Sequence, residues 1–225
     1  MKKFAVIVAG GIGSRMNQTM PKQFLLLNGK PIIYYTISTF LQAYVDVRII
    51  IVIHKDFINE IEEIAKDLDT SRINIIEGGE TRFQSVKNGL QLVEKDSIVF
   101  VHDAVRCLVS VSLIQRCYEH AIKNGNAIPV VTATDSIRLQ NGDSSSSVER
   151  NKVKIVQTPQ TFKSNMLLQA FEKEHQENFT DEATVVELNG NVIELIEGEF
   201  QNIKITRPSD LILASYYLEI NNTFL

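Results

Sequence analysis

Hydrophobic positions in the chain gather in short runs of strand length, which alternate with longer segments of mixed character. Nearly uninterrupted apolar runs cover 4–8, 47–53, 97–101 and 127–131, and a shorter one covers 74–76. Continuous apolar runs of this length are typical of strands that are buried on both faces of a parallel sheet. We therefore expect these runs to form the central strands.

Between the runs, apolar residues recur at helical spacing. The expected helices cover 31–43, 56–68, 81–93, 111–123, 163–174 and 206–218. Thr180 precedes two acidic residues as a helix N-cap would, and 192–196 and 203–205 resemble closing strands. The alternation of strand and helix predicts an α/β protein with a Rossmann-like, mostly parallel twisted sheet and helices on both faces.

The alternation of strand and helix stops after 131. Two runs of alternating polar and apolar residues flank an Asn141-Gly142-Asp143 turn, which is the pattern of a β-hairpin. This arm, about 134–157, contains little that could form a core of its own. Such an arm usually packs on another subunit, which predicts a homodimer; the alternative is a hairpin exposed to solvent. We expect 1–225 to form a single domain that carries this arm.

Composition narrows the classes of function. The 225 residues carry a formal net charge of −4, so the chain as a whole has no attraction to nucleic acid or to an anionic membrane surface. The first apolar run ends at glycines and is too short for a secretory signal or a membrane span, so a cytoplasmic protein is expected. Cys107 and Cys117 lack the spacing of a metal site and are expected to be free thiols.

A glycine-rich turn follows the first apolar run. Gly10, Gly11 and Gly13 are succeeded by Arg15 and Lys22, and no carboxylate stands between residues 3 and 46. Backbone N–H groups and uncompensated positive charge both favour a polyphosphate, which predicts nucleotide binding. The turn lacks the third glycine of a dinucleotide fingerprint and the ending of a P-loop. The alternative is a plain connection between strand and helix.

Two further groups follow neighbouring strands of the predicted sheet. Gly78 and Gly79 come after the run at 74–76, and Asp103 and Arg106 come after the run at 97–101. Parallel strands present their carboxyl ends at one edge, so two glycine turns there could hold one nucleotide. Asp103 could bind a divalent metal or a ribose hydroxyl, with Arg106 on a phosphate; the alternative is a structural pair of the two side chains.

Several motifs, in order along the chain, together resemble the 2-C-methyl-D-erythritol 4-phosphate cytidylyltransferases, a family of sugar-phosphate nucleotidyltransferases. They are Ala9-Gly10-Gly11-Ile12-Gly13-Ser14-Arg15-Met16 with Pro21-Lys22-Gln23-Phe24, Gly78-Gly79-x-x-Arg82-x-x-Ser85-Val86, Val101-His102-Asp103-Ala104-Val105-Arg106, Thr158-Pro159-Gln160, Thr180-Asp181-Glu182-Ala183 and Asn202-Ile203-Lys204-Ile205-Thr206-Arg207-Pro208. The resemblance covers essentially the whole chain. It implies transfer of CMP from CTP to 2-C-methyl-D-erythritol 4-phosphate with release of pyrophosphate, a step of non-mevalonate isoprenoid synthesis.

The resemblance also implies roles for particular residues. Arg15 and Lys22 would be catalytic, through their positive charge on the α-phosphate. CTP would be bound by Ala9, Gly10, Gly11, Gly13, Gly79, Glu80, Ser85 and Ala104. The polyol phosphate would be bound by Asp103, Arg106, Ser136, Arg150, Thr180 and Lys204, with Ser136 and Arg150 from the arm of a partner subunit. Magnesium would be held mainly by the CTP phosphates, with Asp103 as the candidate protein ligand.

Three positions depart from the family pattern. Glu80 stands where aspartate is common, Ser136 where threonine is common, and Cys107 where proline usually follows the arginine. The first two keep a polar group but change its reach. The alternative functions are a ribitol 5-phosphate cytidylyltransferase and a non-catalytic nucleotide-binding paralogue. A dinucleotide oxidoreductase fits least well, because Met16 replaces the third glycine.

Overall fold

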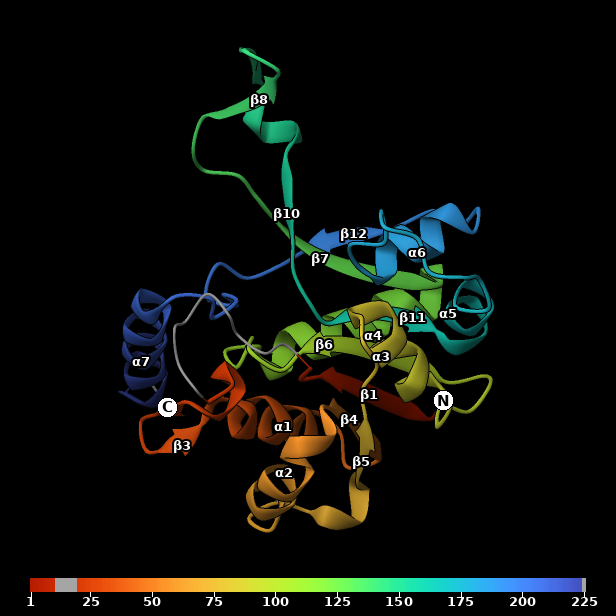
Figure 1. The fold of residues 1–225 in the computed structure, drawn as a ribbon, viewed down its shortest axis with the longest axis vertical. Helices are drawn as coiled ribbons and strands as arrows, with labels where there is room; N and C mark the ends of the chain where they lie inside the picture. The colour runs from red at the N-terminus through yellow and green to blue at the C-terminus, as the bar shows by residue number, and fades with distance from the viewer. Residues whose placement is uncertain (11–19, 224–225) are drawn as a thin grey trace.

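The computed structural model describes residues 1–10 and 20–223. Its central sheet follows the strand order β10-β7-β11-β6-β1-β4-β5, with β12 paired to β7 (Figure 1). The parallel strands are β1 (Lys3–Val8), β4 (Val47–Ile53), β5 (Ile73–Glu77), β6 (Ile98–Asp103), β7 (Asn126–Thr132) and β12 (Leu195–Glu197). The apolar runs that the sequence marks as central strands all lie in this sheet, so the predicted α/β fold is confirmed.

Two strands of the sheet run antiparallel to their neighbours. β11 (Gln160–Lys163) pairs with both β6 and β7, and β10 (Lys154–Val156) pairs with β7. The sequence predicts no strand at β11, because Gln160 and Thr161 interrupt any apolar run. Both residues are nevertheless buried. The short strand therefore owes its place to pairing on both sides, which hydrophobic patterning does not show.

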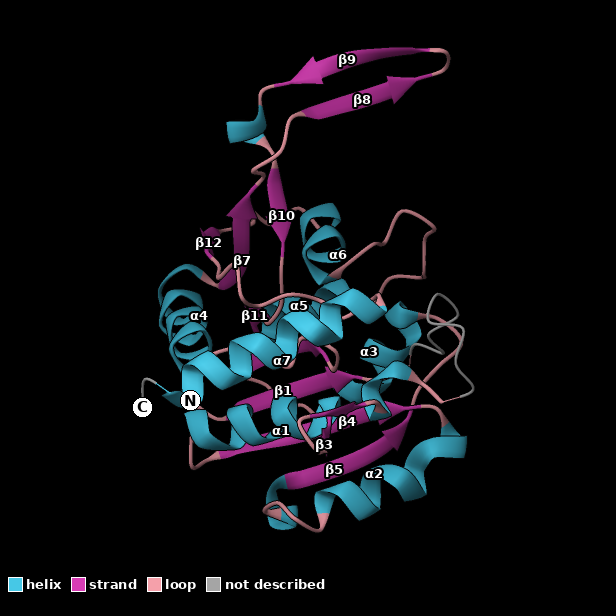
Figure 2. Ribbon diagram, turned by 90° about the vertical axis from the view of Figure 1, so that its left-hand side faces the viewer, coloured by secondary structure: helices cyan, strands magenta, loops and turns pink. Residues whose placement is uncertain are grey.

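Helices cover both faces of the sheet (Figure 2). On one face α1 (Ile32–Ala43), α2 (Ile58–Ala65) and α4 (Val111–Asn124) pack with Ala5 and Ile7 of β1. On the other, α3 (Arg82–Leu90), α5 (Ser164–Ala170) and α6 (Glu182–Leu188) pack with Phe4 and Val6. Because successive side chains of a strand point to opposite faces, β1 divides its residues between two apolar cores.

The remaining elements extend from the edges of the sheet. A third apolar cluster joins α7 (Pro208–Thr223) to the β2 (Leu26–Leu27) and β3 (Lys30–Pro31) ribbon. The expected strand at 203–205 is wrong: only the N–H of Ile205 bonds the main chain of the neighbouring segment, at the carbonyl of Val105 (3.0 Å). Single-turn 3-10 helices are Lys22–Phe24, Lys55–Phe57, Thr70–Arg72 and Arg150–Lys152.

The segment between β7 and β10 carries a two-stranded antiparallel hairpin. Its strands are β8 (Ile137–Asn141) and β9 (Ser144–Val148), paired from Ile137 and Val148 to the turn. Figures 1 and 2 show the hairpin standing away from the central sheet. Neither strand contains a buried residue. Separately, none of the described helices is both long and apolar enough to cross a membrane.

Candidate active site

A cavity of about 310 Å³ opens at the carboxyl edge of the sheet. It is bounded by the end of β1, the turn after β5, the start of α3 and the end of β6. The lining residues are Val8, Ala9, Gly10, Lys22, Gln23, Gly79, Glu80, Thr81, Arg82, Ser85, Asp103, Ala104, Val105 and Lys204. The structure thus brings the two predicted turns together at Gly10 and Gly79. Gly11, Gly13 and Arg15 lie outside the described residues.

Ser85 lies between the two glycine turns. The N–H of Gly79 donates to Ser85 Oγ (3.1 Å), and the Ser85 hydroxyl donates to the carbonyl of Thr81 (2.9 Å). A Cβ at Gly79 would lie 2.1 Å from Cγ of Gln84, whereas one at Gly10 would meet, among the described residues, only Ser85 Oγ at 3.6 Å. The backbone at position 79 therefore needs glycine because of close packing.

Lys22 is placed at the cavity by the residue that follows it. Gln23 is 3% exposed, and its side-chain amide donates to the carbonyl of Ala9 (2.6 Å), at the end of β1. Phe24 is also buried, so the turn that starts at Lys22 is held by the hydrogen bond of Gln23 and by the packing of Phe24 in the core. Among the sequence-predicted catalytic residues, Lys22 is thus brought to the cavity. Gln23 is a supporting residue, which the sequence analysis placed in a motif but gave no role.

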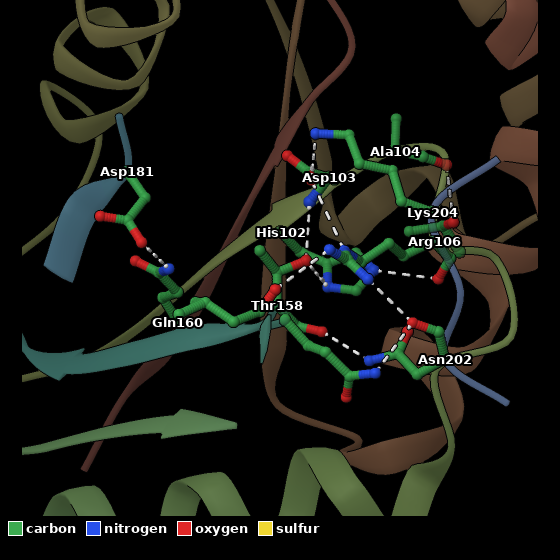
Figure 3. Close-up of polar contacts among 12 residues, drawn as sticks. His102, Asp103, Ala104, Arg106, Thr158, Gln160, Asp181, Asn202 and Lys204 are labelled. Atoms are coloured by element: carbon green, nitrogen blue, oxygen red, sulfur yellow. Dashed lines mark hydrogen bonds and ion pairs between the residues drawn. The ribbon is translucent and has the colours of Figure 1, made fainter. Parts of the chain in front are cut away.

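Three cations surround Asp103, the last residue of β6, and Figure 3 shows two of them, Lys204 and Arg106. Lys204 Nζ lies 2.8 Å from Oδ2, Arg82 Nη2 lies 3.3 Å from Oδ1, and Arg106 Nε lies 3.6 Å from Oδ2. Burial alone would raise the pKa of Asp103, but Arg82, Lys204 and Arg106 outweigh it and hold that pKa well below its usual range. Asp103 is therefore an ionised carboxylate at the cavity wall.

Arg106 links Asp103 to two neighbouring main-chain segments. Its Nη1 donates to the carbonyl of Asn202 (2.9 Å) and its Nη2 to that of Val156 (3.3 Å). Arg106 does not line the cavity, and burial lowers the pKa of its guanidinium. This geometry favours the structural ion pair between Arg106 and Asp103, which the sequence left open as an alternative. Binding of the polyol phosphate by Arg106 stays a prediction.

A buried hydrogen-bond chain holds the turn between Asp103 and Arg106. The N–H of Asp103 donates to Thr158 Oγ1 (3.1 Å), which lies 2.9 Å from His102 Nδ1, and His102 Nε2 lies 3.1 Å from the carbonyl of Arg106. Since a carbonyl only accepts, Nε2 carries the proton and Nδ1 accepts from Thr158. Burial lowers the pKa of His102 to about 4, so the ring is neutral. This geometry gives His102 a supporting place.

The start of α6 lies near the cavity but differs from the expected cap. Asp181, not Thr180, is the N-cap: its Oδ1 accepts from the N–H of Thr184 (2.9 Å). Gln160 fixes this end, because its Oε1 accepts from the N–H of Ala183 and its Nε2 donates to Asp181, both at 2.8 Å. The cap prediction at Thr180 is wrong by one position. Thr180 is exposed and does not line the cavity.

Ser136 and Arg150 lie in the segment that carries the hairpin. Both are exposed, and Arg150 Nη1 donates to the carbonyl of Thr134 (3.2 Å). Neither lines the cavity. Within one chain, therefore, the structure does not bring these two predicted residues to the other members of the candidate site.

Among the described residues, a magnesium ion finds few suitable protein ligands near the cavity. The described residues contain no group of three or more His, Cys, Asp or Glu side chains that could hold a metal. Lys204 and Arg82 occupy the two oxygens of Asp103. Magnesium requires oxygen ligands and repels such cations, so Asp103 does not fit as a protein ligand for it.

Known proteins are similar to this chain along nearly its whole length. Residues 4–220 match the family model described as 2-C-methyl-D-erythritol 4-phosphate cytidylyltransferase (IspD). A curated protein of that name from Bacteroides thetaiotaomicron is 42% identical over 219 residues, covering 97% of this chain and 100% of that protein. Another from Clostridium perfringens is 40% identical over 223 residues, covering 97% and 99%.

Solved structures agree with the sequence comparison. The crystal structure of 4-diphosphocytidyl-2C-methyl-D-erythritol synthase from Anaerococcus prevotii has a TM-score of 0.83 at 28% identity, covering 97% of this chain and 96% of that one. The Francisella tularensis 2-C-methyl-D-erythritol 4-phosphate cytidylyltransferase has a TM-score of 0.80 at 32% identity, covering 96% and 99%. The chain belongs to the 2-C-methyl-D-erythritol 4-phosphate cytidylyltransferase family.

Proposed function

We propose that this enzyme transfers the cytidylyl group of CTP to 2-C-methyl-D-erythritol 4-phosphate and releases pyrophosphate, as a step of non-mevalonate isoprenoid biosynthesis. One observation carries the proposal beyond family membership. The same cavity combines two glycine turns, at Gly10 and Gly79, with the salt bridge between Asp103 and Lys204. A backbone-lined turn suits a nucleotide, and a paired cation suits a second phosphate.

The glycine-turn side of the cavity is assigned to CTP. The proposed nucleotide contacts are Ala9, Gly10, Gly11, Gly13, Gly79, Glu80, Ser85 and Ala104. Exposed Glu80 reaches the cavity from the turn after Gly79, where it could meet the base. The floor is set by main-chain bonds: Ala9 N–H donates to the carbonyl of Val52 (2.8 Å) and Ala104 N–H to that of Val8 (3.1 Å).

The opposite side is assigned to the polyol phosphate. Asp103 would accept from the polyol hydroxyls, and Lys204, whose side chain is 42% exposed, would bind the phosphate. Thr180, Ser136 and Arg150 are proposed to complete this side. Because Ser136 and Arg150 do not line the cavity of their own chain, we propose that they reach the cavity of a partner in a homodimer, through the arm at about 134–157.

The reaction needs no difficult proton transfer. A phosphate oxygen of the polyol attacks the α-phosphorus of CTP, a new P–O bond forms, and the bond from the α-phosphorus to the bridging oxygen breaks as pyrophosphate leaves. Negative charge grows on the α-phosphoryl oxygens and on the leaving group. Lys22 at the cavity, and Arg15 outside the described residues, are proposed to stabilise that charge.

Magnesium is proposed to arrive with the nucleotide. Since the described residues offer no fitting protein site, the ion would be bound mainly through the triphosphate, as magnesium-bound CTP. In this arrangement the protein supplies position and positive charge. We propose that 1–225 acts as one nucleotidyltransferase domain; its expected cytoplasmic location stays a prediction.

Pyrophosphate release tests the proposed function. The protein is mixed with CTP and magnesium, and either 2-C-methyl-D-erythritol 4-phosphate or D-ribitol 5-phosphate is added. We expect release with the first and at most slow release with the second. Preference for ribitol 5-phosphate would support the alternative substrate. Release with neither would contradict a cytidylyltransferase function and support a non-catalytic nucleotide-binding protein.

A further inference from the structure

An ion pair at the cavity joins two helices that are distant in sequence. Arg82 is the first residue of α3, and Glu182 is the first residue of α6. The guanidinium donates to both carboxylate oxygens, through Nη1 to Oε1 and through Nη2 to Oε2 (3.0 Å). Glu182 is 1% exposed, whereas Arg82 lines the cavity. The buried carboxylate thus fixes the orientation of a cavity side chain.

The same guanidinium also reaches Asp103. Nη2 of Arg82 lies 3.3 Å from Asp103 Oδ1, while Lys204 Nζ lies 2.8 Å from Oδ2. Burial opposes the charge of Arg82, but Glu182 and Asp103 outweigh burial and raise its pKa above the usual range. Arg82 is therefore a permanent cation that is shared by two carboxylates. Its stronger contact is with Glu182, which leaves Lys204 as the short partner of Asp103.

Stability alone does not account for a carboxylate at position 182. Complete burial raises the pKa of Glu182, because desolvation outweighs the attraction of Arg82. A buried ion pair is weak evidence for stability, since apolar residues of similar size often serve as well or better. The pair lies at the cavity wall and contacts a residue that we assign to the acceptor substrate. Its position therefore points to substrate binding.

We propose that Glu182 is a positioning residue for the polyol phosphate. It holds Arg82 back, so that Arg82 makes only one long contact with Asp103. Lys204 then keeps its place between Asp103 and the cavity. Without the charge of Glu182, Arg82 would turn fully onto Asp103 and displace Lys204. This inference rests on the proposed function, because it concerns the acceptor side of that site.

The test is Glu182→Gln, which keeps the size of the side chain and removes its charge. We expect the KM for 2-C-methyl-D-erythritol 4-phosphate to rise roughly 10-fold to 100-fold, the range for a displaced charged hydrogen-bond partner. The Kd for magnesium-bound CTP, measured by calorimetry, should change by less than about threefold. The value of kcat should change by a smaller factor than the KM for the polyol phosphate. Glu187→Gln is the matched control: it makes the same change at an exposed position of α6 and should alter neither constant.

A double-mutant cycle shows whether Glu182 acts through Arg82. If it does, Arg82→Gln with Glu182→Gln should raise the acceptor KM no more than Arg82→Gln alone. An unchanged acceptor KM in Glu182→Gln would overturn the inference. Equal losses of acceptor and CTP binding, or additive effects in the cycle, would overturn it too, because they indicate a general structural role.

A second variant and a control assay keep the test decisive. Should Glu182→Gln fail to fold, Arg82→Lys keeps the positive charge but loses the two-point bond, and it should still raise the acceptor KM; an unchanged KM would overturn the inference. The unaltered enzyme is assayed beside the variants. A lack of pyrophosphate release by the unaltered enzyme would mean that the proposed function has failed, whereas normal release with unaffected variants would mean that only the role of Glu182 has failed.

Discussion

The N–H of Gly79 donates to Ser85 Oγ at 3.1 Å, so a serine of α3 closes the turn that follows β5. This bond sets the distance between the turn and the helix. It also brings the Ser85 hydroxyl within 3.6 Å of the position that a Cβ of Gly10 would occupy. The two glycine turns of the cavity are therefore packed against one side chain. A substitution that disturbs either contact should weaken nucleotide binding.

Gly79→Ala should weaken CTP binding strongly. The new methyl group would lie 2.1 Å from Cγ and 2.5 Å from Cβ of Gln84, so the turn or the start of α3 must move. Among the residues that the structure describes, a methyl group at Gly10 makes only an ordinary contact with Ser85 Oγ, so Gly10→Ala should keep the thermal stability of the unaltered protein. Calorimetric Kd for CTP and Tm would be measured for both variants. Equal Tm and equal Kd in the two variants would show that packing at Gly79 is unimportant.

Lys22→Ala should slow turnover with little effect on folding. Removing a donor that stabilises charge in the transition state typically lowers kcat by roughly 10²–10³, about 3–4 kcal/mol. Pyrophosphate release at saturating substrates gives kcat, and circular dichroism checks the fold. Gln23→Ala offers a comparison, because it removes the bond to the Ala9 carbonyl and should displace Lys22 without removing its charge. Near-normal kcat in Lys22→Ala would exclude a catalytic role.

His102 should make the protein less stable in mild acid. Its pKa is lowered by burial from 6.5 to about 4, so the unfolded chain binds a proton before the folded one does. The stabilising contribution is complete above pH 6.5 and is lost as the pH falls through about 4, a loss of about 3 kcal/mol. Urea unfolding of the unaltered protein and of His102→Gln between pH 7 and 4 measures it. Parallel curves for the two proteins would contradict this prediction.

Arg150 should act in the cavity of the partner subunit. If so, each site takes Lys22 from one subunit and Arg150 from the other, and Lys22→Ala and Arg150→Ala remove side chains that different subunits supply. Dimers mixed from the two variants would each hold one intact site, so random exchange of equal amounts should restore about a quarter of normal activity. Each variant incubated alone serves as the control. Activity no higher than the sum of the separate variants would contradict a shared site.

Patterning along the chain could predict the middle of the sheet, because β1, β4 and β6 are buried on both faces and read as continuous apolar runs. The meeting of the turns at Gly10 and Gly79 also followed, since parallel strands share one edge. β11 could not be predicted in this way, because buried Gln160 is satisfied by bonds to α6 rather than by an apolar environment. Local sequence carries no sign of such a partner.

Pairs that are distant in sequence were equally inaccessible. Arg82 and Glu182 stand 100 positions apart, and each begins a helix whose local pattern is complete without the other. Likewise, the bond between His102 and Thr158 depends on β6 and the segment before β11 lying side by side. The sequence could name groups that line the cavity, such as Lys22, Asp103 and Lys204, but not the buried groups that hold them in place.

A phosphate of the polyol should displace pyrophosphate from CTP. The decisive measurement incubates the enzyme with CTP labelled at the α-phosphorus, magnesium and 2-C-methyl-D-erythritol 4-phosphate, and then separates the products. We expect the α-label in a cytidine diphosphate-linked polyol, and label placed at the γ-phosphorus in pyrophosphate. An α-label that remained in CTP, or that appeared only in free CMP, would show that no such displacement occurs.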